Sequence, residues 1–278
     1  AVCKGSLYTL ISDYRNTRMI LKTYQNGQWN AVTTLAGYAT NSPVLGAVGD
    51  RLYTVAAANE QNPQVKVLQE DRWESVGDPL SVAYMASPVI FSYNGNPAFA
   101  CGDFTAGKTP VWVWDGSRWT SLLEDADGYA KKLAVSTAGN MIYILANNSS
   151  SGARLYSLDQ KTGGRDTKNI QMLGTGLLDL GLAAGGQYLY FSAVTADGKA
   201  NVYSAMQTNP AALAQLGSTV YAPALSSSLT RIKTNLYCAA VPQTDGSMDV
   251  RYYQALDREP VDPDPAPDPD PAPDPDPD

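Results

Sequence analysis

A short unit recurs six times along the 278-residue chain, and its spacing limits the folds that the chain can adopt. Each unit is a polar or glycine-containing turn followed by a short strand-like run that closes on an aromatic residue. The six aromatic residues are Tyr8, Tyr53, Phe99, Tyr143, Tyr190 and Tyr237. Successive members lie 45, 46, 44, 47 and 47 positions apart. A fixed period of this length is typical of repeat architectures.

Each unit also contains further runs of alternating polarity, which predict half-buried β-strands. One such run follows the aromatic strand in every unit, at 19–24, 65–68, 111–114, 154–158, 201–204 and 250–253. An outer strand follows this run. In the first three units it contains Trp29, Trp73 and Trp119, and in two later units it is predicted at 169–173 and 212–216. We expect each Trp to be buried between neighbouring repeats. An inner strand rich in small residues is predicted before the turn, at 42–48, 87–92, 132–136, 182–184 and 224–227.

Four strands per repeat of about 45 residues predict one blade of a β-propeller. The sequence therefore predicts an all-β protein, with a six-bladed β-propeller of four-stranded blades over residues 1–261 and a disordered Pro/Asp-rich tail over residues 262–278. Residues 1–3 align with the end of an inner strand, and residues 257–259 align with an outer strand. Two ways of closing the ring stay open, either interleaved terminal strands or direct packing of the first blade on the last.

The charge of the chain is concentrated at its C-terminal end. Residues 262–278 contain seven Asp and no basic residue, so 20 of the 27 acidic residues remain to balance the 20 Lys and Arg. Alternating Pro favours an extended polyproline II segment at roughly 3.1 Å per residue, which gives the tail a reach on the order of 50 Å. The tail is interpreted as a spacer. A plain solubilising end, a proline-rich ligand and a weak calcium binder are the alternatives.

The composition excludes several classes of function. The chain has no His, which excludes Ser-His-Asp and Cys-His nucleophiles, His general bases and His-based zinc sites. No glycine-rich phosphate-binding motif is present, and a neutral globular part beside an anionic tail disfavours nucleic acid binding. The chain contains no run of 18 apolar residues, so the sequence predicts no membrane-spanning segment. The sequence therefore predicts no cofactor and no metal site.

Three Cys residues allow one disulfide across the ring. Cys3 and Cys238 fall in the first and last units, which are neighbours in a closed ring, so a Cys3–Cys238 disulfide would fasten the seam. The alternative is that each is a buried free thiol that packs as a small hydrophobic residue. The first residue is Ala, which fits a mature secreted chain after removal of a signal peptide and fits a trimmed chain equally.

A repeated tyrosine indicates a ligand site. The connections into the inner strands contain Tyr38, Tyr84, Tyr129 and Tyr221, and these connections meet on one face of a propeller around the channel mouth. Rings with hydroxyl tips suit sugars or extended peptides, which need stacking and a few hydrogen bonds. In the alternative interpretation each Tyr packs its own loop against the next blade.

The run Val113-Trp114-Asp115-Gly116-Ser117-Arg118-Trp119-Thr120-Ser121-Leu122 resembles repeats of Kelch-type and galactose-oxidase-like propellers from bacterial surface and secreted proteins. The resemblance covers residues 1 to about 261 and rests on the period and the strand pattern. It implies a secreted or surface-displayed bacterial protein. Copper-radical oxidases of this fold need two His ligands, so the resemblance does not extend to that activity.

The leading hypothesis is a non-catalytic, extracellular or cell-surface recognition module, expected to be a monomer. It would bind a glycan or a protein through the channel-mouth face, with the tail as spacer. One alternative is a carbohydrate-active enzyme, a hydrolase or lyase that uses Tyr residues and carboxylates such as Asp103, Asp127 and Asp179. The other alternative is an inert scaffold domain of a larger surface protein.

Overall fold

The computed structural model describes residues 1–38, 43–58, 61–123, 128–148, 152–170, 173, 177–221, 228–232, 235–242, 248–254 and 256. These residues form almost only β-strands, with one short 3₁₀ helix, η1 (Tyr14–Asn16). No helix among the described residues has the length and the apolar composition needed to cross a membrane.

The strands form six antiparallel sheets of consecutive strands, numbered here in chain order. Sheet 1 contains β1 (Val2–Cys3), β2 (Ser6–Asp13), β3 (Arg18–Gln25) and β4 (Gln28–Ala36), and sheet 2 contains β5 (Leu45–Val48), β6 (Arg51–Ala58), β7 (Gln61–Gln69) and β8 (Arg72–Ser75). Sheet 3 contains β9 (Met85–Tyr93), β10 (Asn96–Asp103), β11 (Val111–Trp114) and β12 (Trp119–Leu123). Sheet 4 contains β13 (Ala130–Ala138), β14 (Met141–Asn148), β15 (Gly152–Asp159) and β16 (Arg165–Ile170). Sheet 5 contains β17 (Asp179–Gly185), β18 (Tyr188–Val194), β19 (Lys199–Met206) and β20 (Asn209–Tyr221), and sheet 6 contains β21 (Ser228–Ile232), β22 (Asn235–Pro242) and β23 (Met248–Gln254).

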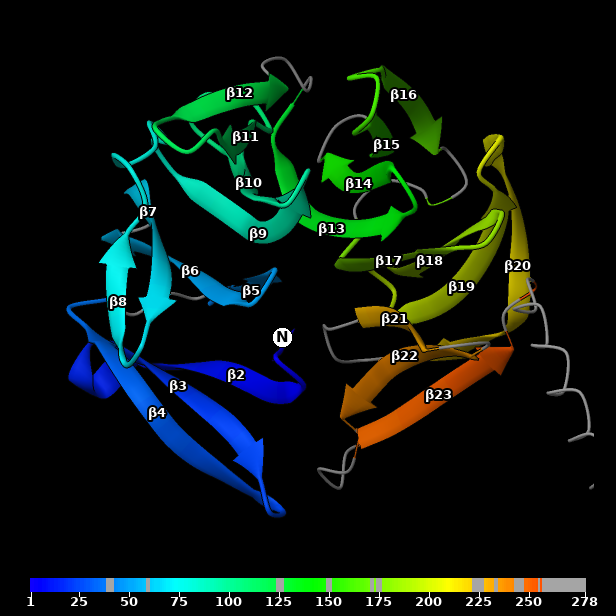
Figure 1. The fold of residues 1–278 in the computed structure, drawn as a ribbon. Coiled ribbons are helices and arrows are strands. Elements are labelled where there is room, and N and C mark those ends of the chain that lie inside the picture. Colours follow the sequence, from blue (N-terminus) through cyan, green and yellow to red (C-terminus); the bar gives the residue numbers. More distant parts are fainter. Residues whose placement is uncertain are drawn as a thin grey trace, which may run out of the picture.

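The six sheets follow one another around a central axis, as Figure 1 shows, and each presents its first strand to the middle. The inner strands β5, β9, β13, β17 and β21 contact one another in that order. This arrangement confirms the predicted β-propeller. Five sheets have the predicted four strands, and sheet 6 has three among the described residues. The outer strand predicted near residues 257–259 lies outside them.

The ends of some strands differ from the sequence-based prediction. The outer strand predicted at 169–173 is β16, at Arg165–Ile170, because a turn anchored by Asp159 ends earlier than expected. The Asp159 carboxylate accepts hydrogen bonds from the N–H groups of Lys161 and Thr162. In sheet 6 the inner strand β21 follows the predicted range 224–227, which lies outside the described residues. At the other end of the chain, β1 pairs with β2, so the N-terminal strand belongs to sheet 1.

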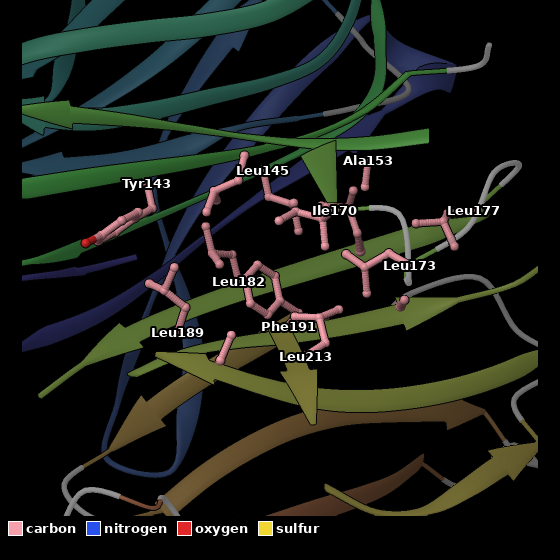
Figure 2. Packing of buried hydrophobic residues seen from close by; sticks show 14 residues of the cluster. Tyr143, Leu145, Ala153, Ile170, Leu173, Leu177, Leu182, Leu189, Phe191 and Leu213 are labelled. Atoms are coloured by element: carbon pink, nitrogen blue, oxygen red, sulfur yellow. The ribbon is translucent and has the colours of Figure 1, made fainter. Parts of the chain in front are cut away.

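The hydrophobic core is divided into clusters that lie between successive sheets. Separate clusters join sheets 1 and 2, 2 and 3, 3 and 4, 4 and 5, and 5 and 6. Figure 2 shows the cluster between sheets 4 and 5, in which Phe191 lies among Leu182, Leu213 and Ile170. Sheets 2, 3, 4 and 5 thus bury both faces on their neighbours, as the inner members of a ring of repeats do.

The repeated Trp residues connect sheets, as predicted, in two of three cases. Trp73 of sheet 2 packs in the clusters shared with sheet 1, and Trp119 of sheet 3 packs against sheet 2. The Trp119 indole N–H also donates to the Val76 carbonyl at 2.8 Å. Trp29 is instead 43% exposed and lies beside Tyr24, with ring centroids 5.2 Å apart.

The cysteines are described for two of the three positions. Cys3, in β1, and Cys101, in β10, are buried, and neither is bonded to another cysteine among the described residues. The side chain of Cys238, in β22, lies outside the part of the chain that the structure describes, so the Cys3–Cys238 disulfide stays a prediction. Burial raises the pKa of the Cys101 thiol far above its ordinary value, and the nearby Asp103 adds to the effect. Cys101 is therefore a protonated, unreactive core residue at neutral pH.

Candidate functional site

Three aromatic side chains, Tyr84, Phe104 and Tyr129, form an exposed cluster that we call the aromatic platform. Phe104 contacts both tyrosines, with its ring centroid 6.1 Å from that of Tyr84 and 4.8 Å from that of Tyr129. The ring planes meet at 70° and 75°, the edge-to-face geometry that aromatic pairs prefer. Tyr84 is 44% exposed and Phe104 is 56% exposed, while Tyr129 is half-buried.

The strand order places the whole platform on one face of the ring. Tyr84 and Tyr129 precede the inner strands β9 and β13, and Phe104 follows the second strand β10. In an antiparallel sheet the start of one strand and the end of its neighbour share an edge. We call this side the mouth face, and the side with the turns between inner and second strands the turn face.

Asp103 fixes one half of the platform. Its Oδ1 accepts hydrogen bonds from the N–H groups of Thr105 and Ala106, both at 3.1 Å, and its Oδ2 accepts from the N–H of Ala83 at 3.2 Å. The Phe104 N–H donates to the Tyr84 carbonyl at 3.1 Å. The backbone on both sides of the Tyr84–Phe104 pair is therefore held by a carboxylate that is only 5% exposed.

Thr109 fixes the other half. Its buried hydroxyl donates to the Gly128 carbonyl at 2.9 Å and accepts from the Ala130 N–H at 2.8 Å, so both neighbours of Tyr129 are bound to one side chain. Close packing of β10 on β13 adds to this restraint, because a Cβ atom on Gly102 would lie 2.0 Å from the Ala130 carbonyl oxygen. The loop between β10 and β11 thus carries Phe104 and anchors both tyrosines.

The structure brings together two of the four predicted site tyrosines. Tyr84 and Tyr129 meet through Phe104, which the sequence analysis missed. Tyr38 is half-buried and packs against the cluster of Met19, Leu35 and Ala56, in agreement with the alternative interpretation of loop packing. Tyr221 ends β20, and its side chain lies outside the described residues. A ligand-binding role for any of these tyrosines stays a prediction.

The carboxylates named for the enzyme alternative have structural partners where they are described. Asp103 is bound to three backbone N–H groups. Asp179 is largely buried, and its Oδ1 lies 3.8 Å from the Lys132 ammonium, which joins sheets 4 and 5. Asp127 lies outside the described residues. In the described part of the chain no three Asp, Glu, Cys or His side chains gather in a way that could hold a metal ion.

A cavity of about 580 Å³ lies between sheets 2 and 3, away from the platform. The turns between the inner and second strands of sheets 2 and 3, at Gly49-Asp50 and Gly95-Asn96, line the cavity on the turn face. Side chains of β6, β7, β8 and β11 also line it. No pattern in the sequence predicted this cavity. Its walls combine apolar residues such as Val67, Pro97 and Trp114 with polar ones.

A close backbone approach shapes the wall that Trp114 forms. A Cβ atom on Gly77, whose φ is +66°, would lie 2.2 Å from the Trp114 ring, so only glycine fits at this position. The Gly77 carbonyl accepts a hydrogen bond from the Gln64 side chain at 3.0 Å. Trp114 also packs on Trp119 with ring centroids 5.6 Å apart, and these contacts hold the indole in place.

The polar side chains of the cavity are available to a ligand. None of five such side chains makes a hydrogen bond or an ion pair within the part of the chain that the structure describes: Asp50, Arg51, Gln69, Glu74 and Asn96. They supply a guanidinium, two carboxylates and two amides beside an indole. Pockets that bind small molecules combine an apolar wall with a few polar groups in this way.

The comparisons with known proteins concern the fold. No family model matches the chain, and no curated protein matches it. A solved structure of the SapL1 lectin in complex with alpha methyl fucoside is similar over 91% of this chain and 93% of the lectin chain, with a TM-score of 0.65 and 13% identity. A chain of the mitotic checkpoint complex is similar over 91% of this chain and 79% of its own length, with a TM-score of 0.57 and 12% identity. With the six-sheet ring, these likenesses show that the chain has the β-propeller fold.

Proposed function

We propose that this protein is a non-catalytic recognition module that binds a carbohydrate, with one sugar ring in the cavity between sheets 2 and 3. The observation that carries the proposal is the set of five polar side chains that line the cavity with Trp114 and have no hydrogen-bond or ion-pair partner among the described residues. Sugar hydroxyls both donate and accept hydrogen bonds, and the apolar face of a sugar ring packs on an indole. The volume falls in the range of small-molecule sites. The lectin of similar fold, solved with a fucoside, supports this choice of ligand class.

The mouth face is the second proposed binding surface. The sequence placed a glycan or protein ligand there, and Tyr84 and Tyr129, with Phe104, are the described residues that support it. Tyr38 and Tyr221 stay in this proposal on the strength of their sequence positions. A secreted or surface-displayed location, the Kelch-type relationship and the spacer role of residues 262–278 are likewise proposals that rest on the sequence pattern.

The enzyme alternative has less support than carbohydrate binding. Asp103 holds backbone N–H groups and Asp179 holds Lys132, so each acid already has a structural task. A pair of acids acting on a glycoside needs one group free to give a proton and one free to attack or to activate water. The cavity acids Asp50 and Glu74 are both exposed to solvent, so they lack the contrasting environments that give the two acids of a catalytic pair different roles.

Glycan-array binding by the wild type and by Arg51→Ala tests the proposal. A hydrogen bond to a charged group contributes about 1.5–3 kcal/mol, so we expect the substitution to weaken binding about 10- to 150-fold. Arg72→Ala is the matched control, because Arg72 is an exposed arginine of the same sheet that does not line the cavity. Its affinity should equal that of the wild type.

Two outcomes would contradict the proposal. If no glycan binds the wild type at millimolar concentration, the protein is not a carbohydrate-recognition module. If Arg51→Ala binds as the wild type does while Phe104→Ala does not bind, the carbohydrate lies on the mouth face and the cavity is not its site.

A further inference from the structure

We propose that the aromatic platform of Tyr84, Phe104 and Tyr129 binds a quaternary ammonium group, such as the one in choline. This inference names a ligand chemistry for the mouth face and does not depend on the carbohydrate proposed for the cavity. The two sites lie on different faces of the ring and share no residue.

The arrangement of the three rings suits a cation. An organic cation is attracted to the face of an aromatic ring when it lies within about 6 Å of the centroid. Phe104 stands at 70° to Tyr84 and at 75° to Tyr129, so each pair of rings forms a corner rather than a flat stack. A group seated in such a corner contacts two rings at once. The exposed fractions of 44% for Tyr84 and 56% for Phe104 leave these rings open to solvent.

A buried negative charge lies next to the platform. Asp103 directly precedes Phe104, is 5% exposed, and forms its hydrogen bonds with neutral backbone N–H groups. Among the described residues no Lys or Arg forms an ion pair with it. A carboxylate that water screens poorly favours a cation nearby and disfavours an anion.

The platform is held in place before a ligand arrives. Asp103 and Thr109 bind the backbone on both sides of the three rings, so little conformational entropy is lost when a ligand binds. A small cation, which offers few contacts, gains most from such preorganisation. Its binding then depends on electrostatic attraction to the ring faces, a property that a neutral molecule of the same shape lacks.

The test compares choline with its uncharged isostere 3,3-dimethylbutan-1-ol in NMR titrations of the full chain. We expect choline to bind at least ten-fold more tightly than the alcohol and to shift the ring resonances of Tyr84, Phe104 and Tyr129. Phe104→Leu, which keeps an apolar side chain without a π face, should weaken choline binding at least ten-fold. Tyr129→Phe keeps the ring and should bind choline nearly as well as the wild type.

Controls separate this inference from the carbohydrate proposal. Tyr14→Leu removes another exposed aromatic side chain from the mouth face, and Arg51→Ala alters only the cavity, so neither should change choline binding. Tyr84→Leu, at an exposed position, replaces Phe104→Leu if that variant does not fold. Equal affinity for choline and for the alcohol, or choline binding unchanged in the Leu variants, would overturn the inference, whatever the cavity binds.

Discussion

Replacement of Phe191 by Ala is expected to lower the free energy of unfolding by about 3–5 kcal/mol. Phe191 lies in the middle of β18, is 0% exposed, and packs in the cluster that joins sheets 4 and 5 (Figure 2). Removal of the ring leaves a cavity in this interface. The surrounding β-strands cannot move to fill it without breaking their hydrogen bonds to neighbouring strands.

Guanidinium chloride denaturation at equilibrium measures this effect. Met206→Ala is the matched control, because Met206 belongs to the same sheet but is 45% exposed, and its loss should cost less than about 1 kcal/mol. A similarly small loss for Phe191→Ala would contradict the packing of sheet 5 on sheet 4. The slope of the transition should not change between the variants if both unfold in one step.

Replacement of Gly102 by Ala is expected to cost about 2–3 kcal/mol, although it adds only one methyl group. The new Cβ atom would lie 2.0 Å from the carbonyl oxygen of Ala130, so β13 must move away from β10. That movement also displaces Tyr129, the residue before Ala130. The variant should therefore lose affinity for any ligand of the aromatic platform together with stability.

Gly164→Ala is the control for this prediction. A Cβ atom on Gly164 would come no closer than 3.1 Å to a neighbour, the hydroxyl of Thr162, and the residue is exposed. It should change the free energy of unfolding by less than about 1 kcal/mol. If Gly102→Ala were as mild as Gly164→Ala, the close contact between β10 and β13 would be wrong, and the support of the platform with it.

Most of the fold could be predicted from the repeat in the sequence. A short run that contains Tyr8, Tyr53 or Phe99 recurs at the spacing of a propeller blade, and the structure places each of these residues in the second strand of its sheet. Local patterns of polarity report which strands exist, because burial of one face imposes the alternation. They report strand ends less well. β16 ends at Ile170, before the predicted limit, because the Asp159 turn sets its position.

The candidate sites were harder to predict, because they are formed by residues from different repeats. Tyr84 and Tyr129 could be placed on one face from their repeat positions, but Phe104 has no counterpart in that pattern. Its role follows only from the hydrogen bonds of Asp103 and Thr109. The cavity could not be predicted at all, because it depends on the approach of two sheets, where a single glycine makes room for Trp114.

Backbone amide NMR with the carbohydrate that binds most tightly on the array tests the central claim most directly, that two neighbouring sheets of the ring enclose a sugar site. Saturation with this ligand should shift amide signals at residues 48–51, 69, 74–77, 95–96 and 114–116, which surround the cavity. Signals of the mouth face should stay in place. Shifts confined to residues outside sheets 2 and 3, with none around Arg51 and Trp114, would contradict the claim.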